Sequence, residues 1–168
     1  MPFFELAKNR YSVRKFKDTG ISDEQINFIL EAGRIAPTAH NAQPQRIKVI
    51  TGQDELRMVD ICTPCRFSAP LVLLICYDKN ESWKRSFDNA DSGEVDASII
   101  TTHMMMQAQD MGLGSCWVMY FDPLKTRELF SLSENLEPVS FLPIGYASED
   151  AVPSEAHSKR KEMKDFLI

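Results

Sequence analysis

A long stretch without formal charge is the feature of this sequence that most constrains its fold. No Asp, Glu, Lys or Arg lies between Asp96 and Asp110. A helix that is apolar around most of its circumference must be buried on opposite sides. We therefore expect a helix over residues 93–111 that ends at Gly112. This helix is either buried on both sides within one chain or covered on one side by a second subunit. We favour the second alternative for this helix. Its apolar side chains form two stripes at helical spacing, one of Val95, Ile99, His103 and Met106 and the other of Ala97, Ile100, Met104, Ala108 and Met111.

The segments around this helix alternate between helical and strand patterns. The four residues from Ser22 to Gln25 form a capping-box signal, and the helix that follows should end before Pro37. Asp122 is expected to cap another helix, with Pro123 at its first position. This order predicts one α+β domain over residues 1–168, with helices around a small sheet. Further helices are expected at 2–9 and 54–61, and strands at 46–51, 71–77, 115–119 and 139–146.

Composition excludes several classes of function. The chain has 168 residues, enough for one domain, and a net charge of −5, which argues against a nucleic-acid-binding face. The longest apolar run, residues 69–77, is far too short to span a membrane. Charges appear too early at the N-terminus for an export signal, so a cytoplasmic protein is expected.

Basic side chains cluster at two distant places in this acidic chain. Arg10 and Arg14 flank the hydroxyl of Ser12, and Arg160 and Lys161 lie near the other end. Guanidinium groups bind phosphate oxygens bidentately, and a serine hydroxyl adds a donor. The alternative is a solvated basic loop. The arm over residues 148–168 is polar and could be disordered, but its apolar end at 166–168 favours an arm held on a surface.

Two of the four cysteines have the spacing of a redox or half-zinc motif. Cys62 and Cys65 are separated by two residues, but no second pair exists to complete a zinc site, so no metal is predicted. A reactive dithiol there remains an alternative. Cys76 and Cys116 lie among apolar residues and are expected to be small core side chains.

Four segments in a fixed order resemble the nitroreductase family of FMN-dependent flavoproteins. They are Arg10 to Arg14, Ala36 to Pro44, Gly112 to Trp117 and Phe141 to Tyr146, within a resemblance that spans residues 3–161. The chain is most similar to the short, single-domain members. The resemblance implies a nitroreductase-like fold with a small, mixed, mostly antiparallel sheet, and an intertwined homodimer with flavins at its interface.

The resemblance also implies which residues bind FMN. Arg10, Tyr11, Ser12 and Arg14 match the segment that holds the phosphate and ribityl chain, although many members have a second arginine in place of Tyr11. Arg160, with Lys161, matches the basic group that reaches this phosphate from the C-terminal arm. Two segments match those that contact the flavin ring in the family. One is the loop from Pro37 to Gln43, which includes Thr38, Ala39 and Asn41 and reaches the ring from the partner subunit. The other consists of Trp117, Val118 and Met119.

The function implied is an FMN-dependent oxidoreductase. Electrons would pass from NADH or NADPH to a small electron-poor acceptor, such as a nitroaromatic or quinone, in a ping-pong scheme. Because the cofactor carries the chemistry, no catalytic side chain is expected. Two alternatives remain: a flavin-binding sensor or carrier without turnover, and a thiol-redox or metal protein built on Cys62 and Cys65.

Overall fold

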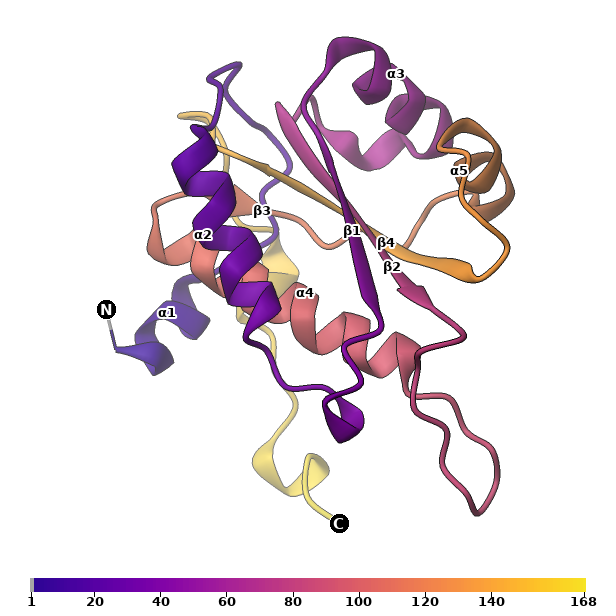
Figure 1. The fold of residues 1–168 in the computed structure, drawn as a ribbon. Helices are drawn as coiled ribbons and strands as arrows, with labels where there is room; N and C mark the ends of the chain where they lie inside the picture. The colour runs from indigo at the N-terminus through magenta and orange to yellow at the C-terminus, as the bar shows by residue number, and fades with distance from the viewer. Residues whose placement is uncertain (1) are drawn as a thin grey trace.

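The fold has a sheet at its centre with helices on both faces (Figure 1). We describe it from a computed structural model that covers residues 2–168. The sheet has the order β1-β2-β4-β3, each neighbouring pair is antiparallel, and an isolated parallel bridge joins Ser12 to Ser115. The α+β fold predicted from the sequence is confirmed. The strands are β1 (Gln45–Ile50), β2 (Leu71–Asp78), β3 (Gly114–Ser115) and β4 (Leu136–Gly145).

Two layers of helices cover the sheet. Helices α2 and α4 pack on one face, and α3 and α5 pack on the other (Figure 1). Short 3-10 turns join or follow these elements: η1 (Ala39–Asn41), η2 (Pro64–Arg66), η3 (Glu155–Ser158) and η4 (Met163–Asp165). The helices are α1 (Phe3–Asn9), α2 (Asp23–Arg34), α3 (Gln53–Cys62), α4 (Gly93–Asp110) and α5 (Pro123–Leu129).

Helix ends follow the local signals of the sequence. Before α2, the Ser22 hydroxyl accepts from the amide of Gln25 at 3.2 Å, and the Gln25 side chain accepts from the amide of Ser22 at 3.1 Å. Asp122 accepts from two amides at the start of α5, where Pro123 occupies the first turn. After α4, Gly112 has a φ of 75°, a left-handed conformation that glycine adopts without strain. All three predicted helix boundaries are confirmed.

Strand β2 is buried on both faces along its whole length. Its side chains alternate between two hydrophobic clusters: Leu73 and Ile75 pack with α2 and α4, whereas Val72 and Leu74 pack with α3 and α5. This alternation is the period-two geometry of a strand. The continuous apolar run therefore has the burial that the sequence predicted.

The two apolar stripes of α4 have different surroundings. Ala97, Ile100, Met104 and Ala108 are fully buried against the sheet and α2. The other stripe, which we call the outer face of α4, is formed by Val95, Ile99, His103 and Met106. Val95 and His103 are exposed, and Ile99 and Met106 are half-buried. The stripe that contains Ala97 thus packs within the chain, whereas the outer face of α4 is only partly covered in a single chain. No helix among residues 2–168 has both the length and the apolar character to cross a bilayer.

The strand predicted at residues 115–119 is much shorter than expected. Only Gly114 and Ser115 form β3, although the amides of Cys116 and Val118 still donate to carbonyl groups of β4. The residue of β4 opposite this break is Pro143, which has no amide hydrogen with which to complete the ladder. The prediction was wrong in extent because it ignored the partner strand.

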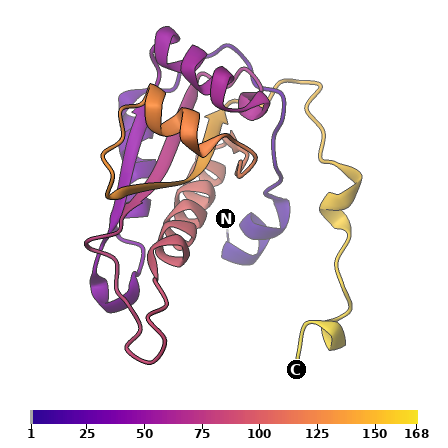
Figure 2. The same cartoon turned by 90° about the vertical axis from the view of Figure 1, so that its right-hand side faces the viewer.

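The C-terminal arm, residues 148–168, is held on the body of the protein only over its first part. The amide of Ser148 donates to the carbonyl oxygen of Lys15 at 3.0 Å. The later part of the arm, which contains η3 and η4, runs away from the sheet and α4 (Figure 2). The apolar end at 166–168 is exposed in the protomer, so the expected contact of this end with a surface is not made within one chain.

Candidate functional site

Basic residues from opposite ends of the chain meet in one pocket. The pocket has a volume of about 230 Å³. Arg160 lines it from the arm, and Lys161 is not among its lining residues. The predicted convergence of Arg10, Ser12, Arg14 and Arg160 is therefore present in the structure. The full lining consists of Arg10, Tyr11, Ser12 and Arg14 from the segment after α1, and Ser154, Ala156, His157 and Arg160 from the arm.

The segment after α1 is fixed against the edge of the sheet. The amide of Val13 donates to the carbonyl oxygen of Ser115 at 3.0 Å, and the Val13 side chain is 1% exposed. A Cβ atom at Gly114 would overlap the Val13 side chain, so glycine permits this close approach. Because side chains alternate along an extended segment, burial of Val13 directs Ser12 and Arg14 the other way, into the pocket.

The arm is fastened to the same segment by polar contacts. Lys15 Nζ donates to Asp150 Oδ2 at 2.6 Å, and this bond, with one from Ser148, lowers the pKa of the Asp150 carboxyl to about 2. The Tyr11 hydroxyl donates to the carbonyl oxygen of Ala151 at 3.4 Å, and the Tyr11 ring meets the His157 ring edge-on. Tyr11 therefore supports the arm that carries Arg160.

The pocket carries positive charge that no carboxylate neutralises. Among residues 2–168, none of Arg10, Arg14 and Arg160 forms an ion pair, and no acidic side chain lines the pocket. Arg160 Nη1 instead donates to the carbonyl oxygens of His157 and Lys159 at 2.5 and 2.8 Å. Three guanidinium groups with a nearby hydroxyl form a site suited to a phosphate group.

The loop of residues 37–43 lies at another place, beside the start of α4. The hydroxyl of Thr38 accepts from the amide of Gln43 at 3.1 Å, and the side-chain amide of Gln43 donates to the carbonyl oxygen of Asn41 at 3.2 Å. The amide of Ala39 donates to Asp96 at 2.9 Å. None of residues 37–43 lines the basic pocket.

The side chains of Trp117, Val118 and Met119 lie in three different surroundings. Trp117 borders a depression of about 390 Å³ with residues of α4 that include Val95 and Ile99. Its indole Nε1 is buried and lacks a hydrogen-bond partner among residues 2–168. Val118 is buried with the α3 and α5 cluster, whereas Met119 is 68% exposed. Within a single chain, the predicted site residues other than Lys161 thus form three separate groups.

Two features of this arrangement were missed from the sequence. His157, which lies in η3, lines the pocket together with Arg160, which follows the extended residue at the end of that turn. Asp96 is 1% exposed and supports the 37–43 loop. The sequence did contain a signal for the role of Asp96, because a carboxylate at the edge of a charge-free apolar helix needs hydrogen-bond donors.

The cysteines do not form a disulfide or a metal site. All four are free, and residues 2–168 contain no cluster of three or more His, Cys, Asp or Glu side chains suited to a metal ion. Burial raises the pKa of the Cys62 thiol, and burial also raises the pKa of Cys116 despite the nearby cations of the basic pocket. Neither buried thiol is therefore activated as a thiolate at neutral pH.

Comparison with known proteins assigns the family. The chain is 41% identical to a nitroreductase family protein from Clostridium difficile of known structure, with a TM-score of 0.94 over 100% of this chain and 98% of that one. An FMN-dependent nitroreductase from the same organism is 25% identical, with a TM-score of 0.76 over 95% and 98% of the two chains.

The sequence comparisons agree with the structural ones. An FMN reductase (NAD(P)H) from Bacillus subtilis is 30% identical over 170 residues, which cover 86% of this chain and 68% of that protein. The sequence model of the nitroreductase family matches residues 7–66 and 64–146, which together make up most of the chain. This protein therefore belongs to the nitroreductase family.

Proposed function

We propose that this protein is an FMN-dependent oxidoreductase that takes electrons from NADH or NADPH and passes them to a small electron-poor acceptor, such as a nitroaromatic or a quinone. The observation that carries the proposal is the pocket where Arg10, Arg14 and Arg160 converge with no acidic side chain among the described residues that line it. Relatives described as FMN reductase and FMN-dependent nitroreductase support it.

The basic pocket fits the phosphate end of FMN. Arg10, Arg14 and Arg160 would bind phosphate oxygens, and the Ser12 hydroxyl would donate one more hydrogen bond. Tyr11 would act by holding the arm through Ala151 and His157. Lys161 would add positive charge at the rim, since it follows Arg160 but does not line the pocket.

The ring end would be bound by the two remaining groups of predicted residues. Trp117 has a buried indole Nε1 with no hydrogen-bond partner among residues 2–168, and it is followed by the buried Val118 and the exposed Met119. Asn41 and Gln43 carry amide groups that suit the polar edge of a flavin. Because the 37–43 loop does not line the basic pocket of its own chain, we propose that it completes the site of a second protomer.

A dimer would also cover the exposed apolar surface. The outer face of α4 borders a groove of about 620 Å³, which is completed by Phe3 of α1 and by Ile35, the residue after α2. Phe3 is 72% exposed and Ile35 is 67% exposed in the protomer. A contiguous apolar surface of this kind is typical of protein interfaces. We therefore propose a homodimer, each protomer being one domain with the arm 148–168.

The chemistry of the reaction would come from the cofactor. Bound FMN supplies a group that accepts two electrons from a nicotinamide and gives them up to an acceptor in a second step. The residues named above would bind and orient it, and Trp117 would limit access of water to one side of the site. A scheme in which donor and acceptor use the same space in turn predicts ping-pong kinetics.

The absorption spectrum of the purified protein tests this proposal. We expect a flavin spectrum, in the protein as isolated or after addition of FMN, that NADH or NADPH bleaches without oxygen and a quinone restores. Initial rates should give parallel lines in double-reciprocal plots. A colourless protein that does not bind added FMN would refute the proposal. Bound flavin without turnover would instead support a sensor or carrier.

The phosphate assignment has its own test. Arg10→Ala should weaken FMN binding by about 1.5–3 kcal/mol, because it removes a charge-assisted contact. Arg57→Ala is a matched control, since Arg57 lies on α3 and pairs with Asp54 at the surface. Equal FMN affinity in the Arg10→Ala and Arg57→Ala proteins would remove Arg10 from the site.

A further inference from the structure

The loop of residues 38–43 has an unusual backbone. His40, Asn41 and Gln43 have φ values of 53°, 54° and 51°, although none is glycine. Left-handed backbone at such residues is unfavourable and persists where surrounding contacts enforce it. Within the loop, the amide of Asn41 donates to the carbonyl oxygen of Thr38, and the amide of Gln43 donates to the Thr38 hydroxyl. These bonds shape the loop but do not place it on the protein.

Among residues 2–168, two contacts attach the tip of the loop, Ala39 and His40, to the body. The His40 ring stacks on the Trp83 ring, with centroids 5.4 Å apart and planes inclined by 13°. The amide of Ala39 donates to Asp96 Oδ1 at 2.9 Å. The Trp83 contact comes from the exposed connection between β2 and α4, whereas Asp96 belongs to the central helix. Asp96 therefore anchors the tip of the loop to the rigid part of the fold, while the end of the loop meets β1 through a 3.4 Å bond from Arg46 Nη1 to the carbonyl oxygen of Gln43.

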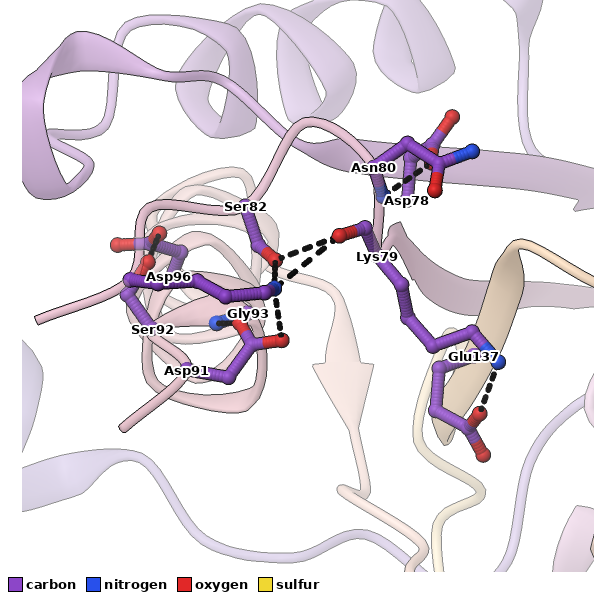
Figure 3. A network of polar contacts seen from close by, with 10 residues as sticks. Asp78, Lys79, Asn80, Ser82, Asp91, Ser92, Gly93, Asp96 and Glu137 are labelled. Carbon is purple, nitrogen blue, oxygen red and sulfur yellow. Dashed lines mark hydrogen bonds and ion pairs between the residues drawn. The ribbon is translucent and has the colours of Figure 1, made fainter. Parts of the chain in front are cut away.

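The carboxylate of Asp96 is buried and fully engaged. Its exposed fraction is 1%. While Oδ1 accepts from Ala39, Oδ2 accepts from the Ser92 hydroxyl at 2.7 Å (Figure 3). A carboxylate has only acceptors, so both oxygens must face donors, and here one donor is in the loop and the other in the residue before the helix. The start of the helix also favours negative charge.

The start of α4 is itself held tightly. A Cβ atom at Gly93 would overlap the ring of Tyr77, so the helix begins in direct contact with β2. The amide of Gly93 donates to Asp91 at 2.8 Å (Figure 3). Lys84 Nζ donates to the same carboxylate at 2.9 Å. The contact of Gly93 with Tyr77 thus fixes the start of α4, and with it Asp96, against β2.

We infer that Asp96 is a positioning residue: its buried carboxylate fixes the 38–43 loop and so sets where Asn41 and Gln43 present their amide groups to the flavin of the partner protomer. This inference depends on the proposed function for the flavin contact. The inference that Asp96 fixes the position of the loop does not depend on the proposed function. A direct cofactor contact by Asp96 is not required.

Two substitutions each remove the hydrogen bond between Ala39 and Asp96, one at the acceptor and the other at the donor. Asp96→Ala deletes the acceptor. Ala39→Pro deletes the donor without touching the helix, and Thr38 is already extended, as a residue before proline must be. Both should weaken FMN binding to the apoprotein about tenfold, the order of one charge-assisted hydrogen bond. Asp96→Asn keeps an acceptor oxygen for Ala39 and should restore most of the affinity.

Hydrogen exchange separates positioning from general loss of stability. Amides 40–43 should exchange faster in Asp96→Ala and Ala39→Pro than in the parent protein. Val59→Ala is the matched control, because Val59 is fully buried on the opposite face of the sheet and its truncation destabilises without touching the loop. This control should leave both FMN affinity and exchange of the loop unchanged.

The outcomes discriminate among the claims. If folded Asp96→Ala and Ala39→Pro proteins bind FMN as the parent does, with unchanged exchange of the loop, the inference is refuted. If Asp96→Ala does not fold, Ala39→Pro decides alone by the same two measurements. If the parent protein binds no FMN, the proposed function and the flavin clause both fail, and exchange of amides 40–43 still decides whether Asp96 fixes the loop.

Discussion

The amide of Val13 donates to the carbonyl oxygen of Ser115 at 3.0 Å, and this bond joins the N-terminal basic segment to the edge of the sheet. It is made at the strand that leads directly into Trp117. One contact thus sets both the direction of Ser12 and Arg14 and their distance from the segment proposed to border the flavin ring. The basic pocket and the ring site share this support.

Arg160 and Lys161 should differ in their effect on cofactor affinity. Arg160 lines the basic pocket, and Lys161 does not. We expect Arg160→Ala to weaken FMN binding by about 1–3 kcal/mol and Lys161→Ala by less than 1 kcal/mol, because an exposed charge outside the pocket is screened. Titration of the apoproteins with FMN measures both. Equal losses would contradict the placement of the arm.

Charge introduced on the outer apolar surface should disrupt the proposed dimer. Ile35→Asp puts a carboxylate in the groove between α1, α2 and α4, where a partner would have to bury it. Light scattering after size-exclusion chromatography should give the mass of a monomer for this variant and of a dimer for the parent. Leu124→Asp is the control, since Leu124 is exposed on α5 outside that groove. A monomeric parent protein would refute the dimer.

The four thiols should react with iodoacetamide at different rates. Burial raises the pKa of Cys62 and Cys116, and burial raises the pKa of Cys76 to about 12, so each has little thiolate at pH 8. Cys65 is half-buried and should be labelled first. Mass spectrometry of the peptides measures the order. Loss of NAD(P)H-dependent activity in step with this labelling would favour the thiol-redox alternative over the flavin.

The contact between Lys15 and Asp150 should make attachment of the arm sensitive to acid. The pKa of Asp150 is lowered from 3.8 to about 2, chiefly by the hydrogen bond from Lys15. A carboxyl with a lowered folded-state pKa stabilises the fold above its unfolded value, and this contribution is lost as the pH falls from about 4 to about 2. NMR titration of the carboxyl carbon should give a midpoint that rises toward 3.8 in Lys15→Ala. An unchanged midpoint would contradict the contact.

Much of the fold could be predicted because its signals are local. The cap at Ser22, the buried run of β2 and the two stripes of α4 depend on residues within a few turns of one another. The strand expected at 115–119 failed because its length is decided by Pro143, a residue on a different strand. Local sequence patterns do not indicate which residues of a neighbouring strand will pair with a given segment.

The candidate site was predicted only in part for the same reason. Arg10, Ser12 and Arg14 are adjacent in sequence, and their convergence with Arg160 followed from resemblance to a family. Nothing local indicated that Ala39 would bind Asp96, which lies 57 residues away. That contact requires the register of the sheet and the position of α4 on it.

Periodicity, caps and side-chain chemistry are properties of short segments, so most of the elements, their order and the residues able to hold an anion could be predicted before the fold was known. The contacts of Lys15 and Tyr11 that hold the arm, and the anchoring of a strained loop by Asp96, emerge only in the folded chain. Contacts between distant segments depend on the path of the whole chain, and that path is fixed by packing on the sheet.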